Sequence, residues 1–396
     1  IMLDNVYVLE LEDDEIKEEM KKIGVANEGI EIMHPKSKFY LLKIEKVPLK
    51  DAIILKQEAL SLGMDCALSW NVVSLKTEYS DALLFGTLKQ FDFLAKKMYI
   101  QPFHGREISE LINESIYNYN LKFKKWKMKD KTIEIKNVKV MGILNITPDS
   151  FYDGGKYFEK ENAIKRIKEM VDEGVDIIDV GAESSRPGSK PIDADTEINR
   201  LKNVIDDAVS TGIPISVDTY KSKVAEFVLE HGAHIINDIY GLRKEGMAEI
   251  IKRYGAGIII MHMKGNPENM QENPTYNDVL SETLSFLKER IKYAINEGIK
   301  LDQISIDPGI GFGKNFDHNI AILKHLEIYK SLGVPITLGL SRKSFLGKLT
   351  GLNVEERLIP SIASAMFAVF KGVDILRVHD VKETKIALKV IEGIMK

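Results

Sequence analysis

The residues best suited to chemistry stand where short apolar runs end. They are carboxylates, amides and cations, namely Asn145, Arg186, Asp218, Asn237, Asp307, Lys343, Arg377 and His379. An Asp or Asn after a strand often caps the next helix, and at any single position that role is as reasonable as a functional one. Arg, Lys and His cannot cap a helix N-terminus, and the same placement recurs from run to run. The sequence therefore predicts a shared site.

The predicted site has two chemical halves. One half contains Asp218, Asn237, Asp307 and Lys343. Its acceptors and donors suit a flat, nitrogen-rich heterocycle, because a carboxylate such as Asp307 can accept two parallel hydrogen bonds from an amidine-like edge. The other half contains Asn145, Arg186, Arg377 and His379. These side chains suit an anion with several oxygens.

The elements that must position these residues alternate between apolar runs and amphipathic helices from residue 135 onward. The runs are Val138–Asn145, Asp176–Ala182, Pro214–Asp218, His234–Ile239, Gly257–His262, Gln303–Gly309, Pro335–Ser341 and Ile375–Asp380. The predicted helices include Ala163–Glu173, Thr196–Ser210, Val279–Glu297 and Ile320–Leu332. Runs that are apolar along their whole length are typical of parallel strands buried on both faces. Eight such units predict an α/β fold, a (β/α)8 TIM barrel over residues 135–396, with an open doubly wound sheet as the competitor.

Residues 1–134 have a different pattern, which predicts a small α+β domain. Val6–Leu11 and Lys38–Ile44 have the spacing of strands, whereas Asp14–Gly24, Lys50–Leu62 and Lys89–Lys97 have the spacing of helices. No motif in this domain points to a chemistry. His104, in a Pro-Phe-His-Gly stretch, is interpreted as a turn residue.

The bulk properties exclude several classes of protein. The chain has 396 residues with Lys+Arg 55, Asp+Glu 59 and a net charge of −4, which provides no general field for nucleic acid or an anionic membrane. No apolar run approaches the length of a membrane span, and no signal peptide is evident. The single cysteine, Cys66, allows no intrachain disulfide, and we expect a cytoplasmic protein.

Two motifs suggest other ligands, and we discount both. The stretch from Gly309 to Lys314 is glycine-rich like a phosphate-binding loop, but Pro308 stands at the first glycine position and Asn315 replaces Ser or Thr. We interpret it as a turn beside the pocket. His262 and His379 are not accompanied by cysteine or a close histidine pair, so a structural zinc is not expected.

Several stretches resemble the signatures of the dihydropteroate synthase family. Met141-Gly142-Ile143-Leu144-Asn145-Ile146-Thr147-Pro148-Asp149-Ser150-Phe151 resembles the first signature, and Asp179-Val180-Gly181-Ala182-Glu183-Ser184-Ser185-Arg186-Pro187-Gly188 resembles the second. Later stretches follow in order, at Asp218, Asn237, Met261, Asp307, Lys343 and Arg377-Val378-His379. The resemblance covers residues 135–396. The family more often has Thr at 185 and Gly at 182, where this chain has Ser185 and Ala182.

The resemblance implies a role for each matching residue. Pterin recognition is implied for Asp218, Asn237, Met261, Asp307 and Lys343. Diphosphate binding is implied for Asn145, Arg377 and His379, with Mg2+ near Asn145. Arylamine binding is implied for Ser185, Arg186, Pro187, Phe312 and Ser344. The residues implied to act in catalysis are Asn145, Asp149, Ser185, Arg186, Arg377 and His379, and Phe151 would close over the site with Asp149.

The implied reaction joins 6-hydroxymethyl-7,8-dihydropterin diphosphate to 4-aminobenzoate or a derivative and releases pyrophosphate, in folate-type pterin biosynthesis. The resemblance also implies a homodimer with small-molecule substrates. Two alternatives stay open. A pterin-dependent methyltransferase that serves a corrinoid protein needs the pterin half of the site without the diphosphate half. A non-catalytic pterin-binding protein would use residues 1–134 as its output module.

Overall fold

The structure is a computed structural model that describes residues 6–146, 156–184 and 188–395, without the side chains of 156–159. Contacts divide the chain into two units, Ile1–Tyr117 and Asn118–Lys396. Each unit has its own hydrophobic core.

The described part of the N-terminal unit is built on a three-stranded antiparallel sheet. Its order is β1-β3-β2, with β1 at Phe39–Pro48, β2 at Asp65–Leu68 and β3 at Tyr79–Thr87. The helices are α1 (Asp13–Ile23), α2 (Asn27–Ser37), α3 (Leu49–Ser61), α4 (Trp70–Val73), α5 (Leu88–Tyr99) and α6 (Gly105–Tyr119). Alternate residues of β3, such as Leu84, are buried against Leu55 of α3 and Phe91 of α5. One face of the sheet therefore carries the core of this unit.

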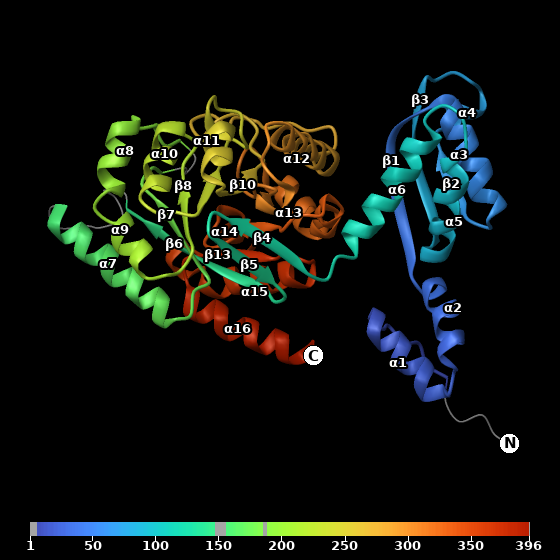
Figure 1. Cartoon of the computed structure of the whole chain (residues 1–396), viewed down its shortest axis with the longest axis horizontal. Coiled ribbons are helices and arrows are strands. Elements are labelled where there is room, and N and C mark those ends of the chain that lie inside the picture. The colour runs from blue at the N-terminus through green and yellow to red at the C-terminus, as the bar shows by residue number, and fades with distance from the viewer. Residues whose placement is uncertain (1–5, 147–155, 185–187, 396) are drawn as a thin grey trace. The chain divides into compact units, whose positions relative to one another are not determined.

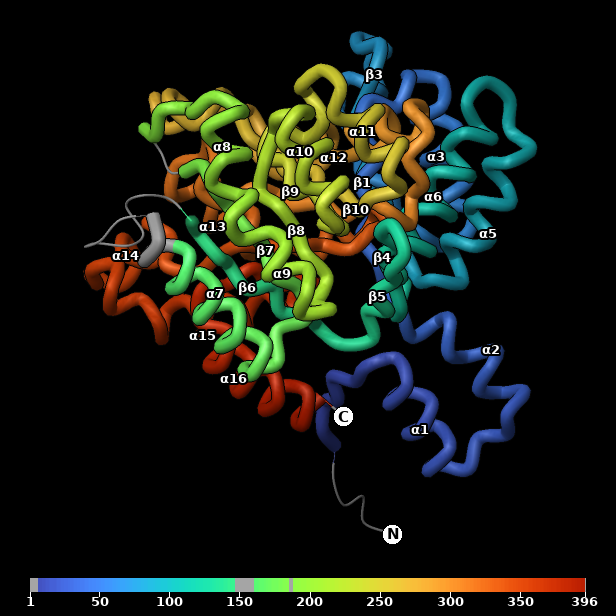
Figure 2. Tube along the Cα trace, turned by 60° about the vertical axis from the view of Figure 1, so that its left-hand side comes forward, coloured from blue at the N-terminus to red at the C-terminus, as the bar shows by residue number. Residues whose placement is uncertain are grey.

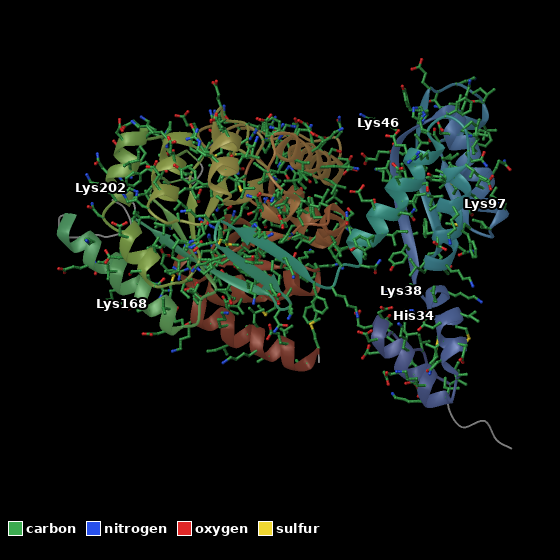
Figure 3. All side chains as sticks on the ribbon, in the orientation of Figure 1. His34, Lys38, Lys46, Lys97, Lys168 and Lys202 are labelled. Atoms are coloured by element: carbon green, nitrogen blue, oxygen red, sulfur yellow. The ribbon has the colours of Figure 1, made fainter. Side chains whose placement is uncertain are left out.

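An ion-pair cluster fastens the first two helices to the start of β1. The Asp13 carboxylate lies 2.6 Å from His34 Nε2 and 2.7 Å from Lys38 Nζ. His34 and Lys38 are labelled in Figure 3, at the end of α2 and just before β1.

The predicted strand Val6–Leu11 is wrong, because residues 6–12 form neither strand nor helix. Val6 and Val8 are 94% and 93% exposed, so the alternating pattern has no partner strand.

The second unit confirms the predicted barrel. In the described residues, eight parallel strands follow the order β11-β10-β9-β8-β7-β6-β13-β12. They are β6 (Lys139–Asn145), β7 (Ile177–Gly181), β8 (Ile215–Asp218), β9 (Ile235–Asp238), β10 (Gly257–Met261), β11 (Ile304–Asp307), β12 (Thr337–Gly339) and β13 (Ile375–Val378). A parallel bridge between Ile306 and Ile336 joins the two ends of this order. Each strand coincides with one of the apolar runs.

Helices surround the strands, as Figures 1 and 2 show. They are α7 (Lys156–Asp172), α8 (Ala194–Leu201), α9 (Ile205–Ser210), α10 (Ser222–Glu230), α11 (Met247–Tyr254), α12 (Val279–Asn296), α13 (Phe316–Lys324), α14 (Ser344–Thr350), α15 (Leu358–Phe370) and α16 (Val381–Ile394). Their buried faces and the strands form one continuous core. No helix in the described residues is long and apolar enough to cross a membrane.

Two predicted helices are interrupted. The predicted helix Thr196–Ser210 is divided into α8 and α9 at Val204, where φ −129 and ψ −27 break the hydrogen-bond ladder. The predicted helix Ile320–Leu332 starts earlier, at the Asn315 cap, and ends at Lys324. His325, with φ −122, separates it from a 3₁₀ helix over Leu326–Leu332.

A lysine-rich hairpin packs under the barrel. Strands β4 (Lys124–Met128) and β5 (Lys131–Ile135) pair antiparallel within the second unit. Trp126 and Met128 are fully buried against Ile177 and Ile235, the first residues of β7 and β9, away from the carboxyl ends of the barrel strands. Trp126 Nε1 donates to Gln303 O at 2.9 Å. The boundary predicted from the sequence, between residues 134 and 135, falls at the end of this hairpin. The contacts place the boundary before the hairpin, between Tyr117 and Asn118.

Candidate active site

A half-buried arginine connects three strands at the carboxyl end of the barrel. Arg377 of β13 donates from Nε to Asp179 Oδ2 at 2.6 Å and from Nη2 to Asp218 Oδ2 at 3.0 Å. Asp179 is fully buried, and Asn237 Nδ2 lies 3.4 Å from its Oδ2. In the register of the sheet, Asp218 stands beside Gly181, and Gly181 stands beside Asn145. Adjacent strands therefore bring these polar groups to one edge.

A second acidic group lies on β11. Asp307 is 7% exposed, and its Oδ1 accepts a hydrogen bond from Gly309 N at 2.7 Å. Lys343, just before α14, donates from Nζ to Ile310 O, and the same Nζ lies 4.5 Å from the centre of the Phe312 ring. The turn that follows β11 therefore links the Asp307 carboxylate, the Lys343 ammonium and an aromatic ring.

Apolar side chains form the wall between these polar groups. Met261, at the end of β10, is 3% exposed and packs with Ile239, Met263 and Met270. The half-buried Phe312 ring packs on this cluster. Such a wall is suited to the face of a planar ring, while the carboxylates and the lysine address its edge.

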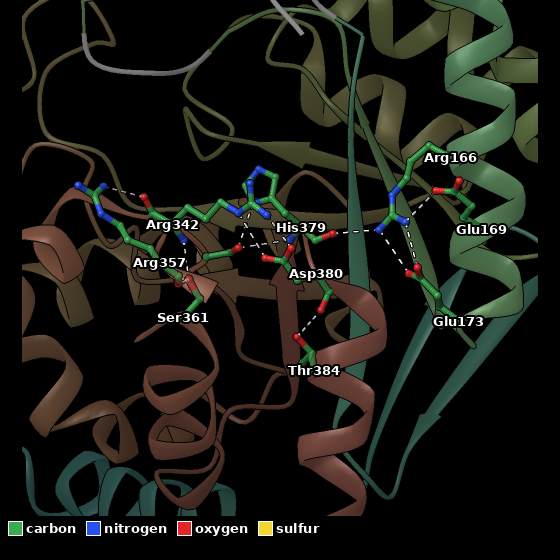
Figure 4. A network of polar contacts seen from close by, with 10 residues as sticks. Arg166, Glu169, Glu173, Arg342, Arg357, Ser361, His379, Asp380 and Thr384 are labelled. Carbon is green, nitrogen blue, oxygen red and sulfur yellow. Dashed lines mark hydrogen bonds and ion pairs between the residues drawn. The ribbon is translucent and has the colours of Figure 1, made fainter. Parts of the chain in front are cut away.

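His379 belongs to a polar network behind the edge of the barrel, shown in Figure 4. Its Nδ1 lies 3.0 Å from Ser341 Oγ, and Arg166 Nη2 of α7 donates to its carbonyl oxygen at 3.0 Å. The next residue, Asp380, accepts a 2.6 Å hydrogen bond from Arg342 Nη2. Arg342 has φ +59, a conformation that is strained for a residue with a side chain. The network holds the ends of β12 and β13 together.

Burial and paired charges shift the pKa values in the site. Burial raises the pKa of Asp218 and of Asp307, and this shift is opposed by Arg377 at Asp218 and by Lys343 at Asp307. Burial lowers the pKa of Lys343 to about 8, against the attraction of Asp307. At Arg377 burial alone would lower the pKa, but Asp179 and Asp218 outweigh it and raise the pKa. Arg377 therefore stays charged at any working pH.

Most predicted site residues converge at this carboxyl edge. The structure brings together Asn145, Asp218, Asn237, Met261, Asp307, Phe312, Lys343, Arg377 and His379 at strand ends or the turns after them. Ser344 is the exposed first residue of α14. Asp149, Phe151, Ser185, Arg186 and Pro187 lie outside the described residues. Arg377, which we expected beside the anion, contacts Asp218 of the heterocycle half.

Asp179 is the residue that sequence reasoning missed. It lies within β7, in a run that is otherwise apolar. A carboxylate on a strand that is buried on both faces must be paired, because an isolated buried charge is very costly. That signal predicts a cationic partner, although it does not say that the partner is Arg377.

Comparisons with known proteins agree with this geometry. A model of the family described as "Pterin binding enzyme" matches residues 141–379. A bifunctional dihydropteroate synthase/dihydropteroate reductase of Helicobacter pylori is 32% identical over 393 residues, covering 98% of this chain and 99% of its own. The dihydropteroate synthase of Clostridium beijerinckii is 44% identical over 65% of this chain and 94% of its own. The Thermus thermophilus dihydropteroate synthase in complex with 4-aminobenzoate has a TM-score of 0.63 and 40% identity, covering 68% of this chain and 100% of its own.

The chain belongs to the family of pterin-binding enzymes. Its activity is that of a dihydropteroate synthase, a transferase, as the relatives and the superposed structure indicate together. This activity decides against the corrinoid methyltransferase and the non-catalytic binding protein that the sequence left open.

Proposed function

We propose that the barrel joins a dihydropterin diphosphate to 4-aminobenzoate and releases pyrophosphate. The observation that carries this proposal is the Arg377 guanidinium bound to Asp179 and Asp218 at the carboxyl edge, with Asp307 and Lys343 near enough to interact with it electrostatically. Asp218, Asn237, Asp307 and Lys343 would hold the edge of the pterin, and Met261 would line its face. Ser185–Pro187, Phe312 and Ser344 would hold the arylamine.

The reaction needs little covalent chemistry from the protein. The C–O bond between the exocyclic methylene and the diphosphate breaks, and the leaving group takes the electron pair. The arylamine nitrogen then bonds to the methylene and loses a proton. When Asp218 is ionised, Arg377 with its two carboxylates carries a net negative charge, which together with ionised Asp307 would stabilise positive charge on the pterin ring. His379, oriented by Ser341, would stabilise the negative charge that grows on the diphosphate.

Magnesium fits this proposal as an ion that arrives with the diphosphate. Mg2+ keeps several waters and commonly uses one or two protein oxygens together with substrate phosphates. Asn145, at the end of β6, offers one amide oxygen, and no cluster of three or more His, Cys, Asp or Glu ligands occurs among the residues described. Asn145 would therefore hold the ion against the diphosphate, and the ion would neutralise charge on the leaving group.

The direct test is pyrophosphate release from the purified chain. Dihydropterin diphosphate and Mg2+ are supplied with 4-aminobenzoate, with a glycosylated aminobenzoate or with aniline. We expect pyrophosphate together with stoichiometric dihydropteroate from 4-aminobenzoate. If the glycosylated aminobenzoate is clearly preferred, it and not 4-aminobenzoate is the substrate. Pyrophosphate release that depends on neither aminobenzoate would refute the proposal.

We also propose a homodimer through α15 and α16. Apolar residues line one face of each helix and are strongly exposed, namely Ile359 at 78%, Phe370 at 58%, Ile386 at 56%, Val390 at 57% and Ile394 at 73%. Exposed patches of this kind mark interfaces in many proteins. Phe370→Asp should convert a dimer to a monomer in analytical ultracentrifugation, and a monomeric parent chain would refute the proposal.

A cytoplasmic location stays a prediction, supported by the single buried Cys66.

A second activity, reduction of the dihydropteroate product, is proposed for the full chain. The Clostridium beijerinckii synthase aligns with 65% of this chain, whereas the bifunctional Helicobacter pylori relative aligns with 98% and so spans the N-terminal unit as well. A reductase must pass two electrons and two protons to a C=N bond of the pterin, and reduced nicotinamide or reduced flavin would supply the electrons.

The reductase proposal is tested on the full chain and on residues 118–396, whose core uses only residues of the second unit. Each protein is incubated with dihydropteroate and reduced nicotinamide, with and without flavin, and tetrahydropteroate is measured. We expect reduction by the full chain and none by the fragment. Equal rates would remove the N-terminal unit from the proposal, and no reduction by either would refute it.

A further inference from the structure

Lys314 is a buried lysine that the reaction above does not use. It is 1% exposed, although it follows a glycine-rich turn. Its Nζ donates to Gly309 O at 2.9 Å and to Phe312 O at 3.0 Å, and it lies 2.8 Å from His262 Nδ1. Burial lowers the pKa of Lys314, and nearby Asp307 opposes this shift. A buried amino group with this many partners is held in one place.

The turn from Gly309 to Gly313 wraps around this amino group. Gly309 has φ +72, and a Cβ there would lie 1.9 Å from His262 O. Gly313 has φ +61, and a Cβ there would lie 2.3 Å from Lys264 O. Only glycine allows this path of the chain. Phosphate-binding loops aim backbone N–H groups at an anion. Here carbonyl oxygens converge on a lysine, so the glycine-rich motif encloses an internal donor.

The same turn carries three groups of the proposed site. Gly309 N donates to Asp307, Ile310 O accepts from Lys343, and the Phe312 ring packs between Lys343 and the Met261 wall. From outside, Gln271 Nε2 donates to Gly311 O at 2.7 Å. Movement of the turn would therefore displace Phe312 and the acceptor of Lys343 together.

We propose that Lys314 is a positioning residue for the arylamine pocket, holding the 309–313 turn so that Phe312 and Lys343 keep their places. The proposal rests on the proposed role of Phe312 in arylamine binding. Lys314 itself touches no substrate. Its removal should weaken arylamine binding more than it slows the chemical step.

The test compares Lys314→Met with Lys324→Met, an exposed lysine on α13 that serves as the matched control. In Lys314→Met the KM for 4-aminobenzoate should rise about tenfold or more, while kcat changes less, because binding geometry is lost and not the reacting groups. Gln271→Ala removes the hydrogen bond to Gly311 O from an exposed position. It should also raise the KM for 4-aminobenzoate. It keeps the test available if Lys314→Met does not fold.

Hydrogen exchange separates this inference from the proposed site. Exchange of backbone amides over residues 309–313 should be faster in Lys314→Met than in Lys324→Met, whatever the turn binds. Unchanged exchange over residues 309–313 in a folded Lys314→Met variant would overturn the inference. Faster exchange with an unchanged KM would instead overturn the arylamine role of Phe312.

Discussion

Replacement of Asp307 by Asn tests the pterin half of the site most directly. Oδ1 of Asp307 accepts from Gly309 N at 2.7 Å, and an asparagine carbonyl oxygen can accept the same hydrogen bond. The fold of the turn should therefore survive. The second oxygen becomes an NH2 group, which presents a donor to the donors of the pterin.

The magnitude follows from the burial of Asp307, which is 7% exposed. A hydrogen bond to a charged group contributes about 1.5–3 kcal/mol, and the opposed donors add a desolvation cost. A total of about 3–4 kcal/mol corresponds to a loss of about 10²–10³ in pterin affinity.

Calorimetric titration of Asp307→Asn with the dihydropterin diphosphate measures this loss. The exposed Asp317→Asn, in the first turn of α13, is the matched control and should bind as the parent chain does. Thermal unfolding of both variants checks the fold. Parent-like pterin affinity in a folded Asp307→Asn variant would mean that Asp307 only fixes the turn through Gly309.

Three further predictions concern charge, pH and the domain boundary. Arg377→Ala should lower turnover about 10²-fold and destabilise the fold by about 3 kcal/mol, because Asp179 and Asp218 lose the cation that holds them in place; parent-like turnover in a folded variant would refute this positioning role. Burial lowers the pKa of Lys343 to about 8, and donation to the pterin requires its proton, so kcat/KM for the pterin should fall as pH rises through about 8. Lys343→Arg should remove this fall at high pH, because arginine stays protonated. An unchanged pH profile in Lys343→Arg would contradict the role of Lys343 as a donor to the pterin. Residues 118–396 should unfold at a clearly higher temperature than residues 132–396, which lack Trp126, since loss of a buried Trp costs about 3–5 kcal/mol; equal midpoints would refute the packing argument.

The barrel strands were predictable because they are apolar along their length, as strands buried on both faces are. The run at Ile177–Gly181, for example, is buried at every residue in the structure. The alternating pattern of Val6–Leu11 failed as a predictor, because alternation indicates a strand only where a partner strand is available, and residues 6–12 pair with none in the described chain. A local pattern does not specify its partner.

The carboxyl-edge placement of the site residues was also predictable, because parallel strands direct their ends to one face. The pairing of Arg377 with Asp179 was not, since these residues are 198 positions apart and meet only when the barrel closes. The sequence identified the polar groups, while the closed sheet determines which charge neutralises which.

Lysine placement shows the same limit at the other end of the barrel. Lys124 and Trp126 alternate with exposed Lys125 and Lys127, a pattern typical of a solvated edge. Yet Lys124 is 8% exposed and lies 2.7 Å from Asp374, and Trp126 is fully buried. The side chain of a lysine is long enough to bury its stem and still reach a carboxylate. Burial of a lysine therefore depends on the partner that the fold supplies, so the local pattern does not reveal that Lys124 and Lys314 are buried.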